Sequence, residues 1–180
     1  MRQIVLLVLL FCFAQAYEYN KLLLRTQSSL YPKLIVMDRK LSSHINDRRI
    51  DLYILVTSID WLYGRYIKEQ LDKLFPKGVG GYILRTKVVN FSTFLADKEK
   101  SADAIYLLKA KEEILEKVAK KIEGKNIYSF TYEKEDLLFG FLFNVSIEKE
   151  VVIYINKRVL LRNDFEFMPE LYQMARFIEP

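Results

Sequence analysis

The chain is poor in the residues that most enzymes and metal proteins use at their reactive centres. Its 180 residues include one cysteine, Cys12, and one histidine, His44. A His-based catalytic triad or a two-His metal site therefore cannot be built within one copy of the chain. With a single cysteine there is no internal disulfide, so an apolar core has to stabilise the fold. We predict no metal, no cofactor and no catalytic residues.

The first residues have the composition of a cleavable signal peptide. Arg2 supplies the basic start, an unbroken apolar run covers 4–13, and Ala14 and Ala16 stand at the −3 and −1 positions. The apolar run is roughly half as long as the stretch of about 20 residues that a membrane-spanning helix needs. We predict cleavage after Ala16 and export to the periplasm, with an uncleaved membrane anchor as the alternative. Cleavage would remove Cys12, so the mature chain would contain no cysteine.

The remainder, 17–180, has the composition of one globular domain. The chain contains 12 Tyr and 12 Phe, which add large apolar area to a plentiful set of aliphatic residues. No stretch rich in Pro, Gly and Ser separates one part of it from another. The formal net charge of the whole chain is +5, and Lys and Glu alternate instead of forming a basic stripe. We therefore expect no nucleic-acid partner.

Apolar periodicity alternates between strand and helix along the domain. The predicted strands cover 34–37, 50–56, 82–89, 104–108, 126–132, 141–147 and 150–155. The predicted helices cover 19–31, 58–75, 92–97, 111–123 and 169–178, with a helical turn at 135–138. Pro32 is expected to end the first helix. The polar segment 38–49 is predicted to be a loop that leaves His44 in solvent.

This alternation determines the fold class that we predict. Strands that alternate with helices pair in parallel through crossover connections. Only Glu148 and Lys149 separate the last two strands, which allows an antiparallel hairpin and nothing else. We predict a single three-layer α/β domain with a mixed, mostly parallel sheet flanked by helices and an antiparallel hairpin near the C-terminus. The glycine-rich segment 78–81 follows a helix and precedes a strand, the reverse of a phosphate-binding loop, so we interpret it as a turn.

The last third of the chain carries several features in a recognisable order. They are an apolar strand with small polar flanks at 102–108, a Gly-bearing turn and strand at 139–144, a strand ending in Ile-Asn at 151–156, a basic helical turn at 157–162, and a final helix with Leu171 and Ala175. In this order, residues 101–178 resemble the YfiR/HmsC type of periplasmic regulator. The chain departs from that family where Gly140 stands alone in place of paired glycines.

The resemblance implies a function as well as a fold. Members of the YfiR type are not enzymes; they bind the periplasmic part of an inner-membrane diguanylate cyclase and hold it inactive. They thereby lower cyclic di-GMP and biofilm formation. The redox behaviour of members that carry cysteines does not transfer to a mature chain without them, and no partner-contact residue transfers either. The sequence leaves open whether the chain also forms a homodimer.

Polar side chains follow the predicted strands at their carboxyl ends, where parallel α/β sheets bind ligands. These residues are Thr57 and Ser58, Lys109, and Thr131 with Tyr132. Ser58 also begins a helix, where free backbone amides attract an anion. We interpret the five residues as a candidate site for a small anion, with Ser58 as the helix cap. The alternative is an ordinary cap with ordinary loop residues.

Two further groups of residues have a candidate role. Trp61 and Ile67 cannot share one narrow stripe with every apolar residue of the predicted helix 58–75. Core packing is the default for the cluster of Trp61, Tyr63 and Tyr66, because helices often bury broad stripes, and an exposed part of it would be a candidate partner surface. The acidic group of Glu133, Glu135 and Asp136 precedes a helical turn. We interpret its charges as complementing the helix dipole, in preference to an acid–base pair.

Two functions from different classes remain open. A periplasmic regulator that docks on an inner-membrane signalling protein of the diguanylate cyclase type would use the aromatic surface. A small solute-binding protein that captures an anion for a transporter would use the strand ends. An exported enzyme is disfavoured, because the usual reactive groups are missing.

Overall fold

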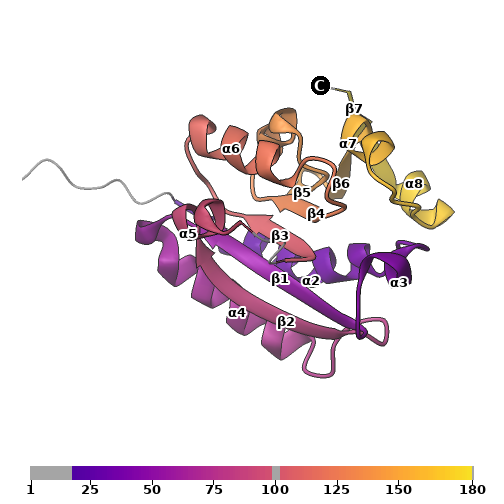
Figure 1. Ribbon diagram of the computed structural model, residues 1–180, viewed down its shortest axis with the longest axis horizontal. Helices are drawn as coiled ribbons and strands as arrows, with labels where there is room; N and C mark the ends of the chain where they lie inside the picture. Colours follow the sequence, from indigo (N-terminus) through magenta and orange to yellow (C-terminus); the bar gives the residue numbers. More distant parts are fainter. Residues whose placement is uncertain (1–17, 99–101, 180) are drawn as a thin grey trace, which may run out of the picture.

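The computed structural model describes residues 18–98 and 102–179, and the predicted leader 1–16 lies outside them. The described chain forms a seven-stranded sheet in the order β2-β1-β3-β4-β5-β6-β7 with helices on both faces (Figure 1). Neighbouring strands pair in parallel except β5 and β6, which form an antiparallel hairpin. The predicted α/β fold class is therefore confirmed.

The elements have the following bounds. The strands are β1 Arg49–Val56, β2 Ile83–Asn90, β3 Ala104–Leu107, β4 Tyr128–Thr131, β5 Phe143–Ile147, β6 Val151–Asn156 and β7 Ala175–Ile178. The helices are α2 Lys21–Ile35, α3 Leu41–His44, α4 Trp61–Leu74, α5 Phe91–Ala96, α6 Glu112–Ile122, α7 Lys157–Arg162 and α8 Pro169–Met174. Two 3-10 turns are η2 Ser58–Asp60 and η3 Glu135–Phe139. Strands β1 to β6 and helices α4 to α6 confirm the predicted elements.

The sheet buries both of its faces. Helices α2 and α4 cover one face, and α5 and α6 cover the other (Figure 1). Along β1, Ile54 and Val56 point into the core beneath α2 and α4, while Leu55 points into the core beneath α5 and α6. Strands β3 and β4 lie in the middle of the sheet and are buried at every residue. Ligands can therefore reach these strands only at their ends.

Buried polar contacts of Gln27 anchor α2 to the sheet. Its Nε2 donates to the carbonyl oxygens of Tyr132 at 3.0 Å and Val145 at 2.8 Å. Its Oε1 accepts a hydrogen bond from the Tyr106 hydroxyl at 2.5 Å. Because buried polar groups need partners, these bonds determine where α2 lies on the sheet. They also position the residues that precede α2 in the chain.

The predicted strand at 34–37 and the predicted helix end at Pro32 are both wrong. Helix α2 continues through Pro32 to Ile35. The helix can continue because Leu34 and Ile35 are buried in the core on the same face as the rest of α2. Tertiary packing thus outweighs the hydrogen bond that proline cannot make.

The predicted helix at 169–178 is only half correct. Helix α8 ends at Met174, and Ala175–Ile178 form β7, which pairs in parallel with β6. Without β7, strand β6 would be an open sheet edge with unpaired backbone groups. Arg176 reinforces the pairing, since its guanidinium lies 3.0 Å from a carboxylate oxygen of Glu148 at the hairpin.

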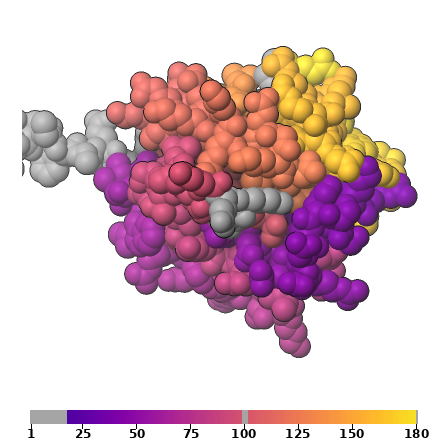
Figure 2. Space-filling model, viewed as in Figure 1, coloured from indigo at the N-terminus to yellow at the C-terminus, as the bar shows by residue number. Residues whose placement is uncertain are grey.

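The prediction that His44 is exposed is also wrong. Residues 41–44 form α3, and the side chain of His44 is 7% exposed. Its Nδ1 lies 3.5 Å from Oδ2 of Asp38, and its Nε2 lies 3.9 Å from Oδ2 of Asp164. The C-terminal segment around Asp164 therefore covers the segment around α3, and Figure 2 shows these yellow and purple regions in contact. The polar sequence of residues 38–49 cannot show that the segment around Asp164, more than 100 residues later, buries His44.

Candidate functional site

The strand order creates a topological switch point between β1 and β3. From β1 the chain crosses to β2 on one side, and then returns to β3 on the other side. At such a point the loops that leave the two strands diverge, and ligands in open α/β sheets bind in the crevice between them. Here the segment 57–60 leaves β1 and Lys109 follows β3. The carboxyl edge of these strands is therefore the candidate site.

The aromatic ring of Tyr19 lies at this switch point. Its centroid is 4.4 Å from the ring of Tyr63 on α4 and 4.9 Å from the ring of Tyr132 after β4. Its hydroxyl accepts a hydrogen bond from the backbone N–H of Lys109 at 3.1 Å. With 6% of its surface exposed, Tyr19 fills the space between these elements.

Asp60 closes the β1 side of the site. The side chain is fully buried, and its Oδ2 accepts a hydrogen bond from the Thr57 hydroxyl at 2.5 Å. Its Oδ1 has no hydrogen-bond partner among the described residues. Burial raises the pKa of the Tyr19 hydroxyl well above its ordinary value, and the negative charge of Asp60 raises it further. Tyr19 is therefore a neutral phenol beside a buried carboxylate.

Lys109 places a positive charge beside the two tyrosine rings. Its Nζ lies 2.9 Å from Oε1 of Glu133, 5.8 Å from the ring centroid of Tyr19 and 5.4 Å from that of Tyr132. Burial by itself lowers the pKa of Lys109, but the hydrogen bond and charge of Glu133 raise it above the ordinary value. The ammonium group is thus charged and already neutralised within the chain.

A second buried carboxyl group, Asp136, lies near this ion pair. It is 7% exposed, and its Oδ2 has no hydrogen-bond partner among the described residues. Burial, followed by the negative charges of Glu133 and Glu135, raises the pKa of Asp136 to about 7, against the opposing effect of Lys109. Carboxyl groups therefore outnumber ammonium groups at this edge, and the local charge does not favour an anion.

The structure brings together three of the five predicted site residues. Tyr19 contacts Lys109 and Tyr132 directly. Thr57 belongs to the same group through its hydrogen bond to Asp60. Ser58 points elsewhere, because its hydroxyl accepts a hydrogen bond from Nδ2 of Asn90 at 2.9 Å. No side chain caps η2 or α4, so the predicted Ser58 cap is wrong.

Thr131 is also separate from this group. It is fully buried within the sheet, and its hydroxyl donates to the carbonyl oxygen of Glu133 at 2.7 Å. It therefore supports the turn after β4 instead of facing a ligand.

The sequence interpretation missed Tyr19 and Asp60. A signal for Asp60 was available, because Thr57 and Asp60 have the spacing of a capping box, although the contact observed here joins their side chains. No local signal indicates Tyr19, whose position depends on the long-range bonds that dock α2. Asp136 does lie at a helical entry as predicted, yet its burial gives it a perturbed pKa that a solvated helix-entry charge would not have.

The predicted aromatic cluster divides into a buried and an exposed part. Tyr63 and Tyr66 pack against the core, whereas Trp61 is 42% exposed. Ile59 and Leu62 beside it are 45% and 75% exposed. We call Ile59, Trp61 and Leu62 the carboxyl-edge patch, because they begin where β1 ends. Core packing, the default prediction, thus holds for Tyr63 and Tyr66, whereas Trp61 is exposed.

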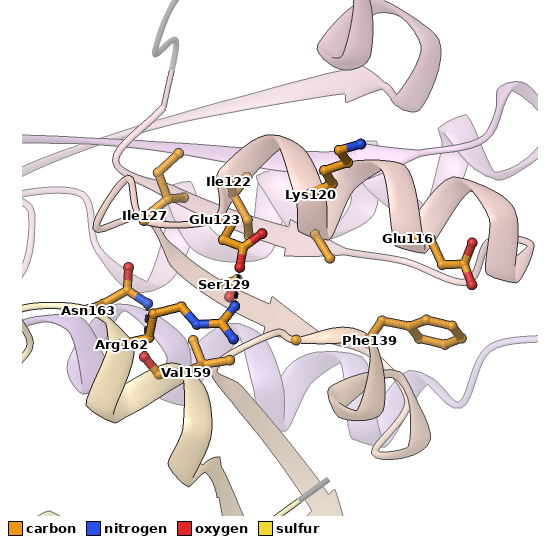
Figure 3. A pocket seen from close by; sticks show the side chains of 13 residues that line it. Glu116, Lys120, Ile122, Glu123, Ile127, Ser129, Phe139, Val159, Arg162 and Asn163 are labelled. Atoms are coloured by element: carbon orange, nitrogen blue, oxygen red, sulfur yellow. Dashed lines mark hydrogen bonds and ion pairs between the residues drawn. The ribbon is translucent and has the colours of Figure 1, made fainter.

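A separate cleft of about 370 Å³ lies between α6 and α7 (Figure 3). Ile122 and Ile127 form its apolar side, and Ser129 contributes from β4. Arg162 of α7 forms an ion pair with Glu123, the residue that follows α6, across the cleft. Both charged groups are about half exposed, so water competes with any ligand for them. The cleft therefore distinguishes no ligand class, in contrast to the switch point.

Within residues 18–98 and 102–179, no helix has the length and apolar character needed to cross a membrane. The same residues contain no group of His, Cys, Asp and Glu side chains arranged to hold a metal ion.

Comparison with known proteins shows similarity in structure only. No protein-family model and no curated protein matches the chain. It is similar to a structure described as the ABC domain in complex with L-Trp from Streptococcus pneumoniae, with a TM-score of 0.59, 13% identity, and coverage of 83% of this chain and 61% of that chain. It is similar to a conserved domain protein from Vibrio cholerae, with a TM-score of 0.59, 11% identity, and coverage of 86% of this chain and 59% of that chain.

The chain thus spans about three fifths of the length of these two structures. At such low identity the likeness shows the α/β fold and nothing more specific.

Proposed function

We propose that this chain is an exported, non-enzymatic regulatory protein. It docks by the carboxyl edge of its sheet on the periplasmic part of an inner-membrane signalling protein, of the diguanylate cyclase type, and holds that protein inactive. The observation that carries the proposal is the carboxyl-edge patch, in which Trp61 and Leu62 are exposed at the start of α4, shortly after the carboxyl end of β1. An exposed tryptophan with aliphatic neighbours is typical of a protein interface.

Two further points support this proposal. Two pairs of polar side chains at the edge are bonded to each other, Thr57 with Asp60 and Lys109 with Glu133, which suits a preformed surface better than a reaction centre. The sequence resemblance to YfiR/HmsC regulators supports the choice of an inner-membrane signalling protein as the partner.

Capture of the partner from membranes tests the proposal. The wild-type chain, immobilised and exposed to native detergent extracts of its own cell membranes, is expected to retain an integral membrane protein with a diguanylate cyclase domain. The double variant Trp61→Ser, Leu62→Ser should lose it, because the patch would no longer be apolar.

The matched control is Leu161→Ser. Leu161 and Leu62 are equally exposed, at 75%, but Leu161 lies on α7 at the opposite edge of the sheet. Capture should survive this change. Recovery of no integral membrane protein by the wild type, or equal loss with the control, would contradict the proposal.

A second candidate function is a small solute-binding protein that delivers its ligand to a transporter. The switch point between β1 and β3 favours it, as does the structural neighbour described in complex with L-Trp. Calorimetric titration with L-tryptophan tests this candidate directly. Saturable heat that disappears in Asp60→Ala would support it, and no heat at millimolar ligand would count against tryptophan as the solute.

A further inference from the structure

We infer that the space filled by Tyr19 is a binding site for a small molecule with a phenol ring, and that Tyr19 is its built-in occupant. The inference concerns the ligand chemistry of the switch point and does not depend on a membrane partner. It rests on three features: aromatic walls, a polar end that matches a phenol hydroxyl, and an occupant whose release leaves the fold intact.

The walls of the site are aromatic. The rings of Tyr63 and Tyr132 lie 4.4 and 4.9 Å from the ring of Tyr19, tilted and edge-on respectively. These are favourable geometries for aromatic pairs. The ammonium of Lys109 adds a cation–π contact to the same ring, at 5.8 Å from its centroid. Another flat aromatic ring would find the same contacts.

The polar end of the site matches a phenol in both hydrogen-bonding roles. The backbone N–H of Lys109 donates to the Tyr19 hydroxyl, which therefore acts as the acceptor. Asp60 presents a fully buried carboxyl group close enough to raise the pKa of that hydroxyl, and its Oδ1 accepts no hydrogen bond from Tyr19 or from any other described residue, so it is open to a phenol that donates. A hydroxyl both accepts and donates, an indole N–H can only donate, and a plain hydrocarbon ring can do neither.

Tyr19 can leave without unfolding α2. The helix is held by the buried bonds of Gln27, and its first amides are capped by the side chain of Asn20, which accepts from Leu22 N at 2.9 Å and Leu23 N at 3.2 Å. Among the described residues, a further backbone hydrogen bond at the start of α2 joins Asn20 N to the Tyr132 hydroxyl at 2.8 Å. Release of Tyr19 breaks that bond and opens the site, while the helix stays docked.

The test compares the variant Tyr19→Ala with a matched cavity elsewhere. We expect p-cresol to raise the melting temperature of Tyr19→Ala clearly more than toluene does, with indole in between, because only p-cresol fills both polar roles. The control is Phe165→Ala. Phe165 is 8% exposed, similar to the 6% of Tyr19, and its ring lies 4.7 Å from that of Tyr128 and 5.9 Å from that of Phe167, but it has no hydroxyl, so its removal leaves a space in which no hydroxyl was bound. Equal shifts with p-cresol and toluene, or an equal p-cresol response in the control, would overturn the inference.

A second variant keeps the test decisive if Tyr19→Ala does not fold. Tyr19→Phe retains the ring but loses the hydroxyl bonds, so the occupant competes less well. Its apparent affinity for p-cresol, measured by calorimetry, should exceed that of the wild type by about tenfold, the worth of one hydrogen bond. An affinity equal to the wild type would show that p-cresol does not compete with Tyr19.

The wild-type chain provides the final readout. Saturating p-cresol should accelerate hydrogen exchange of the Asn20 amide, while the amides from Leu24 onward in α2 remain protected. Binding of p-cresol with unchanged exchange at Asn20 would place it elsewhere and overturn the inference. This result is independent of membrane capture, since the patch and the Tyr19 site are altered by different variants.

Discussion

Buried acidic groups lie at both ends of the sheet, and their hydrogen bonding differs. At the amino ends of the strands, both oxygens of Asp38 are paired. Oδ1 accepts from the backbone N–H groups of Lys40 at 2.9 Å and Glu166 at 3.0 Å, and Oδ2 accepts from the Tyr128 hydroxyl at 2.6 Å. His44 lies next to the same carboxylate. Asp38 therefore joins the segment that follows α2 to the segment that precedes α8, and both of its carboxylate oxygens already accept hydrogen bonds.

At the carboxyl ends of the strands, Asp60 and Asp136 each keep one buried oxygen without a hydrogen-bond partner among the described residues. An unpaired buried carboxylate oxygen costs stability, so it needs an explanation other than structure. The fully paired Asp38 thus has a structural role, whereas Asp60 and Asp136 each leave one buried acceptor oxygen free of hydrogen bonds from the described residues.

The largest effect on the free energy of unfolding is expected from removing the Asp38 carboxylate. Asp38→Ala leaves two backbone amides and the Tyr128 hydroxyl without their acceptor. The free energy of unfolding, measured by urea denaturation, should fall by about 3–5 kcal/mol. A loss below about 1 kcal/mol would remove the contrast between the two ends of the sheet.

The next effect concerns the anchor of α2. Gln27→Leu conserves volume but leaves the carbonyl oxygens of Tyr132 and Val145 and the hydroxyl of Tyr106 unpaired. We expect a loss of about 2–4 kcal/mol in urea denaturation and faster hydrogen exchange at the start of α2. Loss of stability without faster exchange there would mean that Gln27 does not position Tyr19.

The substitution Asp136→Asn, in contrast, should raise the free energy of unfolding at neutral and higher pH. The pKa of Asp136 is raised to about 7 in the folded chain, so the folded state binds this proton more tightly than the unfolded state does. The contribution of the Asp136 carboxyl group to the free energy of unfolding is therefore fully present below about pH 4. It is lost as the pH rises toward about 7. The variant should be more stable than the wild type by about 2 kcal/mol at about pH 8, with the difference shrinking at about pH 5. A variant less stable than the wild type at the higher pH would show that the charged form is needed.

The smallest effect is expected at Ser58. Its hydroxyl caps no helix, so Ser58→Ala should change the free energy of unfolding by no more than about 0.5 kcal/mol. Calorimetric titration with phosphate should give no heat for either protein, since carboxyl groups predominate at this edge. Saturable phosphate binding that is lost in Ser58→Ala would restore the predicted anion site.

The sequence was informative where the relevant contacts are local. The alternation in residues 50–147 predicted β1 to β5 and helices α4 to α6, because each of these elements buries its own apolar pattern. Once a parallel sheet is predicted, its carboxyl ends follow. Of the five residues named there, Thr57, Lys109 and Tyr132 lie around Tyr19, directly or through Asp60. The helical geometry alone leaves the exposure of Trp61 open, because helices often bury broad apolar stripes.

The errors all involve contacts between distant parts of the chain. Ile35 is helical and Ala175 begins a strand because of what packs or pairs with them, not because of their neighbours in sequence. Likewise, His44 is buried by the segment around Asp164. Tyr19 reaches the switch point only because Gln27 docks α2 on carbonyl oxygens that follow it by more than 100 residues. No short pattern encodes such a separation.

The cover that residues 163–168 form over α3 has a consequence for the order of folding. Lys40 pairs with Asp164 and Arg39 with Glu166, so the first and last parts of the domain close on each other. A chain emerging from a ribosome or a translocation channel, amino end first, cannot complete this closure until its final segment is released. Until then the amino side of the sheet stays uncovered at this point. Residues 163–168 can therefore complete the fold only after the rest of the domain has been synthesised.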